Sequence, residues 1–304
     1  MSSTKTSTRR AASAKQSAKN AKARSRARRS RDPRRATRSG RMTWIIVGVV
    51  VVVFAALLIA TVAGRGGSGG TRALAPASLV HQVTSVPDSV ANEVGLGTGK
   101  LPIAIKGSSE ASNGKPVVTY MGAEYCPYCA GERWAMVLAL SRFGTFEKLG
   151  STHSSSYDAY PNTPTFTFHG SSFSSPYLEF QPVEMNTNQL SGSDYGTLDT
   201  PTEAQRKLMA TYDAPPYFQT QGAIPFVDFG GKYALSGAGY DVSVLQGKSA
   251  SEIAAALHDP NSPVAKAIVG TANAITAAIC SVTNDQPASA CSIPAVKTLR
   301  AQLG

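Results

Sequence analysis

Two of the four cysteines have a spacing that can support thiol chemistry. Cys126 and Cys129 are separated by Pro127 and Tyr128 and follow a run of β-branched and aromatic residues. Two cysteines spaced in this way at a helix start can close a disulfide, and the helix N-terminus favours the thiolate of the first. The pattern therefore predicts that Cys126 attacks a disulfide and that Cys129 resolves the mixed disulfide. A purely structural disulfide is the alternative, although so short a loop adds little stabilisation.

A strand and a helix must hold this pair of cysteines. Residues 117–121 form a β-branched and aromatic run bounded by turn residues, which predicts a buried strand. After Cys129, apolar residues recur at helical spacing until Gly144, a typical helix stop. The predicted helix therefore has Cys126 at or near its N-cap and Pro127 at its first position, where a proline is well tolerated.

A second pair of strands is predicted further along the chain. Residues 225–229 and 232–235 are short apolar runs joined by Gly230 and Gly231, which predicts a β-hairpin. Pro225 opens the first run, a place where a missing backbone N–H is tolerated. The chain thus combines a strand, a Cys-x-x-Cys turn, a helix and a later hairpin, which is an α/β pattern.

The residues around the cysteines resemble the active-site turn of the thioredoxin superfamily. The resemblance rests on Ala123-Glu124-Tyr125-Cys126 followed by Pro127-Tyr128-Cys129, and the Pro-Tyr dipeptide is typical of glutaredoxins. More closely, the segments GAEYCPYCAGERWA and YPNTPTFTFHGSSFSSPYLEF are similar to membrane-anchored thioredoxin-like proteins grouped as domain of unknown function 929. This similarity covers about residues 80–285.

The resemblance implies a thioredoxin-like fold and a thiol–disulfide oxidoreductase that acts on protein or peptide thiols and disulfides. In that superfamily a cis-proline lies opposite the Cys-x-x-Cys, so Cys126, Cys129 and Pro225 are the implied catalytic residues. The backbone at Ile224 and the side chain of Tyr128 are the implied substrate contacts. The alternative is a non-catalytic thioredoxin-like binding or scaffold module at the cell surface.

The sequence departs from the thioredoxin pattern in two ways. Thioredoxins carry a buried acid six residues before the first cysteine, and here that position is Tyr120. The proton acceptor for the resolving thiol is therefore missing or supplied elsewhere, either by Glu124 or, if Glu124 is simply exposed, by another group. The second departure is the interval of 99 residues from Cys126 to Pro225, which is longer than the plain fold uses.

We interpret this interval as an insert, followed by a helical C-terminus. Residues 163–169 and 175–185 are alternating, Pro-bounded runs joined by Gly-Ser-Ser, which predicts an inserted β-hairpin that faces the substrate as a lip. A helix is predicted over residues 202–212, and residues 248–285 are interpreted as a C-terminal helical extension.

Cys280 and Cys291 are separated by ten residues. In an oxidising compartment, a pair that closes a loop of this size is typical of a structural disulfide. The alternatives are a zinc site built from both cysteine pairs and a relay of electrons to Cys126 and Cys129. Zinc has weaker support because a zinc ribbon needs two C-x-x-C motifs. The four histidines form no ligand pattern and no nucleotide-binding motif occurs, so we expect no metal and no cofactor.

The positive charge of the chain is concentrated in an N-terminal arm. The formal net charge is +11, but residues 1–41 hold 15 of the 30 Lys and Arg residues and only one acid. This arm contains no aromatic residue and no Leu, Ile or Val, and it is predicted to be disordered. It sets membrane topology and contacts anionic lipid in our interpretation. Binding of nucleic acid is the alternative, and since no aromatic residue is present to stack on bases, we expect no nucleic-acid partner.

A transmembrane helix is predicted over residues 42–63, which contain no charged residue. As a helix they reach roughly 33 Å, enough to cross a hydrocarbon core of about 30 Å and to contact membrane lipid. A cleaved signal peptide is the alternative, although its apolar core is usually shorter. The excess of arginines before residue 42 predicts a cytoplasmic N-terminus. A Gly-rich tether (64–72) and an extracytoplasmic thioredoxin-like domain (73–304) then follow, with a membrane redox partner as a further expectation.

Overall fold

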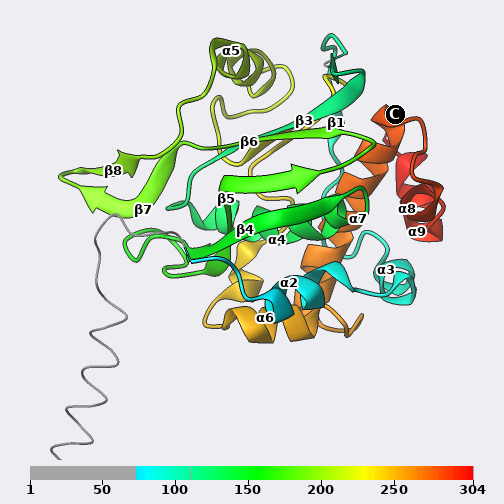
Figure 1. Cartoon of the computed structure of the whole chain (residues 1–304), viewed down its shortest axis with the longest axis horizontal. Coiled ribbons are helices and arrows are strands. Elements are labelled where there is room, and N and C mark those ends of the chain that lie inside the picture. Colours follow the sequence, from blue (N-terminus) through cyan, green and yellow to red (C-terminus); the bar gives the residue numbers. More distant parts are fainter. Residues whose placement is uncertain (1–72, 110, 304) are drawn as a thin grey trace, which may run out of the picture. The chain divides into compact units, whose positions relative to one another are not determined.

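A computed structural model describes residues 73–109 and 111–303 (Figure 1). The predicted basic arm, transmembrane helix and tether lie outside these residues. The described residues form a mixed α/β domain with a mixed sheet and eight α-helices. The strands are β1 (Ile103–Ala104), β2 (Ala111–Ser112), β3 (Lys115–Gly122), β4 (Thr145–His153), β5 (Pro164–Ser174), β6 (Glu179–Glu184), β7 (Asn186–Ser191), β8 (Asp194–Thr197), β9 (Phe226–Phe229) and β10 (Tyr233–Ser236). The helices are α2 (Ala77–Thr84), α3 (Asp88–Val94), α4 (Pro127–Ser141), α5 (Glu203–Tyr212), the 3-10 helix η1 (Val242–Leu245), α6 (Ala250–Ala256), α7 (Pro263–Val282), α8 (Ala288–Cys291) and α9 (Pro294–Arg300).

The main sheet is built around β3. This strand pairs in parallel with β6 on one side and antiparallel with β9 on the other, and β9 pairs antiparallel with β10. The short strand β1 pairs with β10, and β2 pairs with the beginning of β3. Because α4 follows β3 directly, the turn with the two cysteines leaves from the carboxyl end of a central strand.

Side chains of the strands alternate between two apolar cores on opposite faces of the sheet. Val118 and Tyr120 of β3 and Val227 of β9 belong to the larger core, which contains the buried side chains of α4 and α7. Met121 of β3 and Phe226 of β9 belong to the smaller core, which α5 closes. Figure 1 shows α4 and α7 on one side of the sheet and α5 on the other.

Most of the elements expected around the cysteines are present. The strand predicted over 117–121 is part of β3, and the helix after it is α4, with Cys126 as N-cap and Pro127 in the first turn. The hairpin over 225–235 is β9 and β10. The predicted helix over 202–212 is α5, which begins with a capping box between Thr202 and Gln205. The helical extension predicted over 248–285 is present as α6 and α7, and two further helices that were not predicted, α8 and α9, follow it.

The inserted hairpin predicted from residues 163–169 and 175–185 is wrong. The Gly-Ser-Ser segment lies inside β5, which pairs antiparallel with β4 instead. Gly170 has a φ of 62°, and here the pairing register shifts, so the segment forms a bulge within a strand rather than a turn. The second predicted run contributes β6, which joins the main sheet beside β3. The predicted substrate-facing lip, which depended on this hairpin, is therefore also wrong.

Within the described part of the chain, α7 is the one helix long and apolar enough to cross a membrane. Its most apolar stretch is 89% buried inside the domain. It packs against α4 and α9, and its buried face includes Ile268, Ile275 and Ile279. The burial of this helix against its neighbours accounts for its apolar composition.

Candidate functional site

The turn between β3 and α4 places the two cysteines in the first turn of a helix. Cys126 has an extended backbone (φ −73°, ψ 122°) and is the N-cap of α4, while Pro127 occupies the first helical position. The Cys126 carbonyl accepts the first helical hydrogen bond, from the Ala130 N–H at 2.9 Å. The unpaired N–H groups of this first turn therefore face the Cys126 side chain. The sequence-based placement of both cysteines agrees with this geometry.

Both thiols are reduced in this structure, but their environments differ. A hydrogen bond from the Cys129 thiol lowers the pKa of Cys126, and so do the backbone N–H groups of Cys129 and Tyr128, against the opposing effect of burial. Burial raises the pKa of Cys129 well above its usual value, and the hydrogen bond to Cys126 adds to this effect. Cys126 is thus the thiol that ionises first, and Cys129 retains its proton.

The Ile224–Pro225 turn lies directly opposite Cys126. The Cys126 Sγ donates to the Ile224 carbonyl at 3.8 Å, and the Ile224–Pro225 peptide bond is cis. The antiparallel pairing of β3 with β9 brings these distant residues together, because Met121 faces Phe226 in that pairing. Of the predicted site residues, Cys126, Cys129, Ile224 and Pro225 therefore meet at one place.

Tyr128 also belongs to this site, at its solvent-exposed edge. Its side chain is 43% exposed and makes an edge-on contact with the ring of Tyr160, with 6.3 Å between the ring centroids. Tyr128 belongs to the first turn of α4 and lies between the two cysteines in the sequence. It is therefore positioned to contact a molecule that approaches Cys126.

A buried ion pair lies behind the cysteines, and the sequence analysis missed it. Arg133, one helical turn after Cys129, forms a two-pronged pair with Glu184, with both N···O distances 2.7 Å. Both side chains have no exposed surface. Glu184 ends β6 opposite Gly122 of β3, so the parallel pairing of these strands carries the carboxylate beneath the cysteine turn. Arg133 also donates to the Ala123 carbonyl at 2.7 Å, which fastens the turn itself.

Tyr120 stands where thioredoxins carry a buried acid, and here a buried acid, Glu184 of β6, lies behind the cysteine turn. Tyr120 is fully buried, and burial raises the pKa of its phenol well above the usual value. The charges of Arg133 and Glu184 act on the Cys129 thiol, the first lowering its pKa and the second raising it. Glu124 is nearly buried and accepts a hydrogen bond from the Thr167 hydroxyl at 2.6 Å, so the interpretation that it is simply exposed is wrong.

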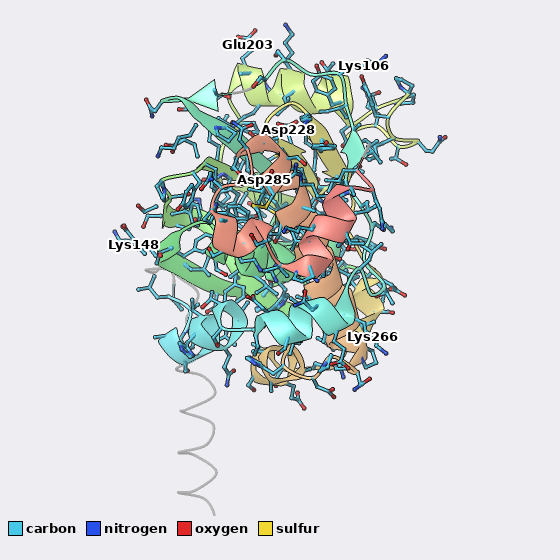
Figure 2. The ribbon with its side chains drawn as sticks, turned by 90° about the vertical axis from the view of Figure 1, so that its right-hand side faces the viewer. Lys106, Lys148, Glu203, Asp228, Lys266 and Asp285 are labelled. Atoms are coloured by element: carbon cyan, nitrogen blue, oxygen red, sulfur yellow. A yellow bond between two sulfur atoms is a disulfide. The ribbon has the colours of Figure 1, made fainter. Side chains whose placement is uncertain are left out.

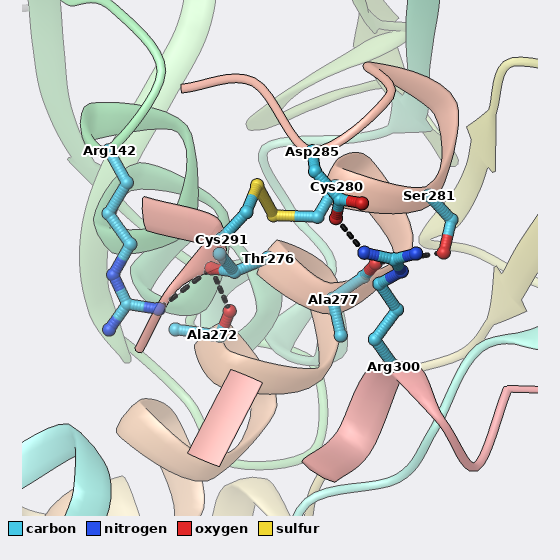
Figure 3. Close-up of a disulfide and its surroundings, with 9 residues drawn as sticks. All are labelled: Arg142, Ala272, Thr276, Ala277, Cys280, Ser281, Asp285, Cys291 and Arg300. Atoms are coloured by element: carbon cyan, nitrogen blue, oxygen red, sulfur yellow. Dashed lines mark hydrogen bonds and ion pairs between the residues drawn. A yellow bond between two sulfur atoms is a disulfide. The ribbon is translucent and has the colours of Figure 1, made fainter. Parts of the chain in front are cut away.

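The remaining cysteines form a disulfide at the far end of α7. Cys280, near the end of this helix, is bonded to Cys291 at the end of α8 (Figure 3). Beside it, Arg142 of the α4 C-terminus donates to the Thr276 hydroxyl at 2.7 Å, and Arg300 pairs with Asp285. These contacts hold the C-terminal helices together, which is the role expected of this pair. Residues 73–109 and 111–303 contain no group of three or more His, Cys, Asp or Glu that could hold a metal ion.

Two surface hollows lie elsewhere on the domain. One, of about 430 Å³, lies between α2 and β4 and is lined by Leu74, Val80 and Phe146 among others. The other, of about 370 Å³, is lined by Gly231 and Ser281 among others. Neither includes Cys126 or Cys129. The candidate site is therefore identified by its thiols, and not by the size of a cavity.

Another buried acid, Glu132 of α4, makes the stability of the domain depend on pH. Glu132 has no exposed surface, and its Oε2 accepts the Gly239 N–H at 2.7 Å, whereas Oε1 has no hydrogen-bond partner among the described residues. Burial raises the pKa of Glu132 to about 7. Because the folded state binds this proton more tightly than the unfolded state, the stability falls as the pH rises between the unfolded and folded pKa values.

We expect Glu132→Gln to remove this part of the pH dependence. The shift from 4.5 to about 7 corresponds to about 3 kcal/mol. The free energy of unfolding of the variant, relative to the natural chain, should therefore rise by about that amount between acidic and mildly alkaline pH. Urea unfolding of the full chain at several pH values measures this difference. A difference that stays constant with pH would contradict the prediction, and Glu203→Gln, at an exposed position in the first turn of α5, is the control.

The fold and the free thiols define a mixed α/β domain with a candidate thiol site at the start of a helix. The chain itself belongs to the family described as Domain of unknown function (DUF929), whose family model matches residues 102–281, more than half of the chain. This match includes Cys126, Cys129 and Pro225 but ends before Cys291. No curated protein and no solved structure matches the chain.

Proposed function

We propose that this protein is a membrane-anchored, extracytoplasmic thiol–disulfide oxidoreductase that acts on protein or peptide disulfides. The observation that carries the proposal is the contrast between the two thiols of the Cys-x-x-Cys pair. The pKa of Cys126 is lowered and the pKa of Cys129 is raised. Cys126 is therefore the thiol suited to attack a disulfide, and Cys129 stays protonated until it resolves the mixed disulfide.

The arrangement of the strands supports a thioredoxin-like fold as part of this proposal. In the order β6-β3-β9-β10, β3 and β6 are parallel and β9 is antiparallel to both of its neighbours. A helix follows β3 and begins at the Cys-x-x-Cys, and α7 packs on the same side of the sheet. This arrangement resembles the thioredoxin superfamily, as do the residues of the turn. The segments β4–β5, β7–β8, α6, α8 and α9 are additions to it.

In the proposed reaction, the Cys126 thiolate attacks one sulfur of a substrate disulfide. A mixed disulfide forms, and the other substrate sulfur leaves as a thiolate that takes up a proton. Cys129 then loses its proton and attacks the Cys126 sulfur, which releases the second substrate thiol. The substrate disulfide is reduced by two electrons, and Cys126 and Cys129 are oxidised to a disulfide. The reverse sequence oxidises a substrate dithiol.

Glu184 is the group that we propose to accept the proton of Cys129. Burial raises the pKa of Glu184 against the opposing charge of Arg133. Its charge acts on the Cys129 thiol, and its ion pair with Arg133 fixes it behind the turn. Glu184 would thus replace the acid that thioredoxins carry at the position of Tyr120.

The location at a membrane is proposed from the sequence alone. The uncharged run over residues 42–63 and the arginines before it favour a single span with the C-terminal domain outside. An outside location also suits the disulfide between Cys280 and Cys291, because structural disulfides persist in oxidising compartments.

A non-catalytic binding module is the second candidate, and the burial of Cys126 favours it. The side chain of Cys126 is only 5% exposed, so a substrate disulfide needs a local movement to reach it. In such a module the cysteines would stay reduced or oxidised without turnover.

The pH dependence of alkylation distinguishes these candidates. We expect Cys126 of the full chain to react with iodoacetamide with a midpoint below the ordinary thiol pKa, because its thiolate is stabilised. Cys129→Ala should raise that midpoint, since the Cys129 thiol is the strongest of the stabilising groups. Mass spectrometry assigns the alkylated residue, and Cys126→Ser gives the background. A midpoint at or above the ordinary value, without exchange on a peptide disulfide, would favour the binding module.

A further inference from the structure

Two surface segments are hydrogen-bonded to the cysteine turn next to Cys126, at Glu124 and Tyr125. The Ser155 N–H, from the loop over residues 154–163, donates to the Tyr125 carbonyl at 2.8 Å. On the other side, the Glu124 N–H donates to the Asn186 carbonyl at the start of β7, at 2.9 Å. The rings of Tyr125 and Tyr195 of β8 are stacked, with centroids 4.1 Å apart and planes within 3°. These contacts join the loop, the β7–β8 hairpin and the cysteine turn into one surface.

Apolar and aromatic side chains are unusually exposed on this surface. Four large apolar side chains are exposed among the described residues, and three of them belong here: Tyr128 at 43%, Tyr157 at 78% and Leu190 at 44%. Leu190 is the cross-strand partner of Tyr195, and Tyr128 contacts Tyr160. We call Tyr125, Tyr128, Tyr157, Tyr160 and Tyr195, together with Asp158 and Asp194, the tyrosine surface. Exposed rings beside Cys126 indicate a binding surface.

The tyrosine surface carries negative charge and no positive charge. Its three segments, residues 123–128, 154–163 and 186–197, contain no Lys or Arg. Burial is the main reason that the pKa of the Tyr125 phenol is raised, and the nearby charge of Asp158 adds to the effect. Asp194 is exposed and is the first residue of β8. The basic side chains labelled in Figure 2, Lys106, Lys148 and Lys266, come from other segments.

We propose that the tyrosine surface binds an extended polypeptide in which Lys or Arg residues flank the reacting cysteine. The proposal rests on the proposed function, because the bound polypeptide would present its disulfide to Cys126. Tyrosine rings attract a cation over their faces, and a nearby carboxylate strengthens this attraction. Rings and carboxylates in segments that contain no Lys or Arg therefore favour basic side chains and disfavour acidic ones.

Binding of cysteine-free peptides tests the surface independently of the chemistry. Two labelled peptides with Ser at the cysteine position are compared, one with flanking Lys residues and one with flanking Gln residues. By fluorescence anisotropy with the full chain, we expect the Lys peptide to bind about five- to tenfold more tightly. The double variant Asp158→Asn/Asp194→Asn should reduce this preference to about two- to threefold or less, the part that the rings alone supply. Asn keeps the oxygen that accepts the Ala159 N–H, so the loop itself is preserved.

Asp259→Asn is the matched control. Asp259 is exposed and accepts a hydrogen bond from the Asn261 N–H, a local contact similar to that of Asp158, but it lies after α6 and away from the cysteine turn. This variant should keep the preference for Lys. Equal affinities of the natural chain for the two peptides, or a preference of unchanged size after the double substitution, would overturn the proposal.

A separate measurement tests the proposed function. Exchange of the natural full chain with hydroxyethyl disulfide, which is small and uncharged, requires Cys126 but no flanking residues. If exchange occurs without any preference for Lys peptides, the proposal for the tyrosine surface is wrong and the proposed function stands. If the preference is present without exchange, the surface proposal stands as a binding site and the oxidoreductase is wrong.

Discussion

Replacing Cys126 by Ser is expected to lower thiol–disulfide exchange by the full chain about a thousandfold or more, to the background rate. A hydroxyl at this position ionises far above neutral pH, so the N-terminus of α4 and the Cys129 thiol have no anion to stabilise. The assay follows reduction of a fluorescent peptide disulfide. Cys280→Ser/Cys291→Ser, which removes the other pair, should retain the exchange chemistry. A Cys126→Ser variant that still reduces the peptide would show that the attacking thiol lies elsewhere.

Cys129→Ala is expected to give the complementary result. Cys126 still attacks, but no second thiol is present to resolve the mixed disulfide, which therefore accumulates. The covalent complex appears as an increase in mass under non-reducing conditions and disappears with reductant. The double variant Cys126→Ser/Cys129→Ala should form none. If Cys129→Ala turned over at the natural rate, another group would be the resolving thiol.

The thiols of this site were predictable because their signal is local. The run over residues 117–121, the Cys-x-x-Cys and the helical spacing after it are contiguous, and short-range rules for strands and helix caps are sufficient. Pro225 required the resemblance to a known superfamily, since nothing in its own neighbourhood points to a thiol 99 residues away.

The buried ion pair was not predictable in this way. Glu184 is the last residue of β6, a strand of ordinary sequence, and the polar β7–β8 hairpin follows it. Only the pairing of β6 with β3 brings Glu184 under the cysteine turn. Our interpretation had assigned this segment to an inserted hairpin, so Glu184 was assigned to the wrong sheet. The signal that was available is Arg133 itself, a charged residue on the face of α4 that points to the core. A buried arginine needs an acidic partner, and a search for that partner would have led to Glu184.

The prediction of an inserted hairpin was wrong because a glycine between two extended runs can mark either a turn or a bulge. Gly-Ser-Ser between two alternating runs is typical of a turn, but the same glycine also permits a bulge within one long strand. Tertiary context decides between them, here through β4, whose residues 145–153 show weak alternation and were not predicted as a strand. The long-range pairing of β4 with β5 cannot be derived from either segment alone.

Breaking the ion pair between Arg133 and Glu184 is expected to cost about 3–5 kcal/mol of the free energy of unfolding. Glu184→Gln leaves the guanidinium of Arg133 charged and without its carboxylate, in a place that has no exposed surface. Arginine does not lose its proton at accessible pH, so the full penalty remains at every pH. Urea unfolding, followed through the buried Trp134 of α4, measures the loss. Glu179→Gln, which removes the half-exposed partner of Lys115 on the same strand, is the control and should cost far less.

Arg133→Met should differ from Glu184→Gln in its dependence on pH. Without the arginine, Glu184 can take up a proton, which relieves the penalty at low pH. The folded pKa of Glu184, which burial already raises, then rises further because the opposing charge of Arg133 is gone, so the stability of Arg133→Met falls as the pH rises between the unfolded and folded pKa values. The double variant Arg133→Met/Glu184→Leu removes both charges and fills the space, and we expect it to be no less stable than Glu184→Gln. If the losses from the two single substitutions simply added in the double variant, the two groups would not be acting as a pair, because additivity is the behaviour of independent sites.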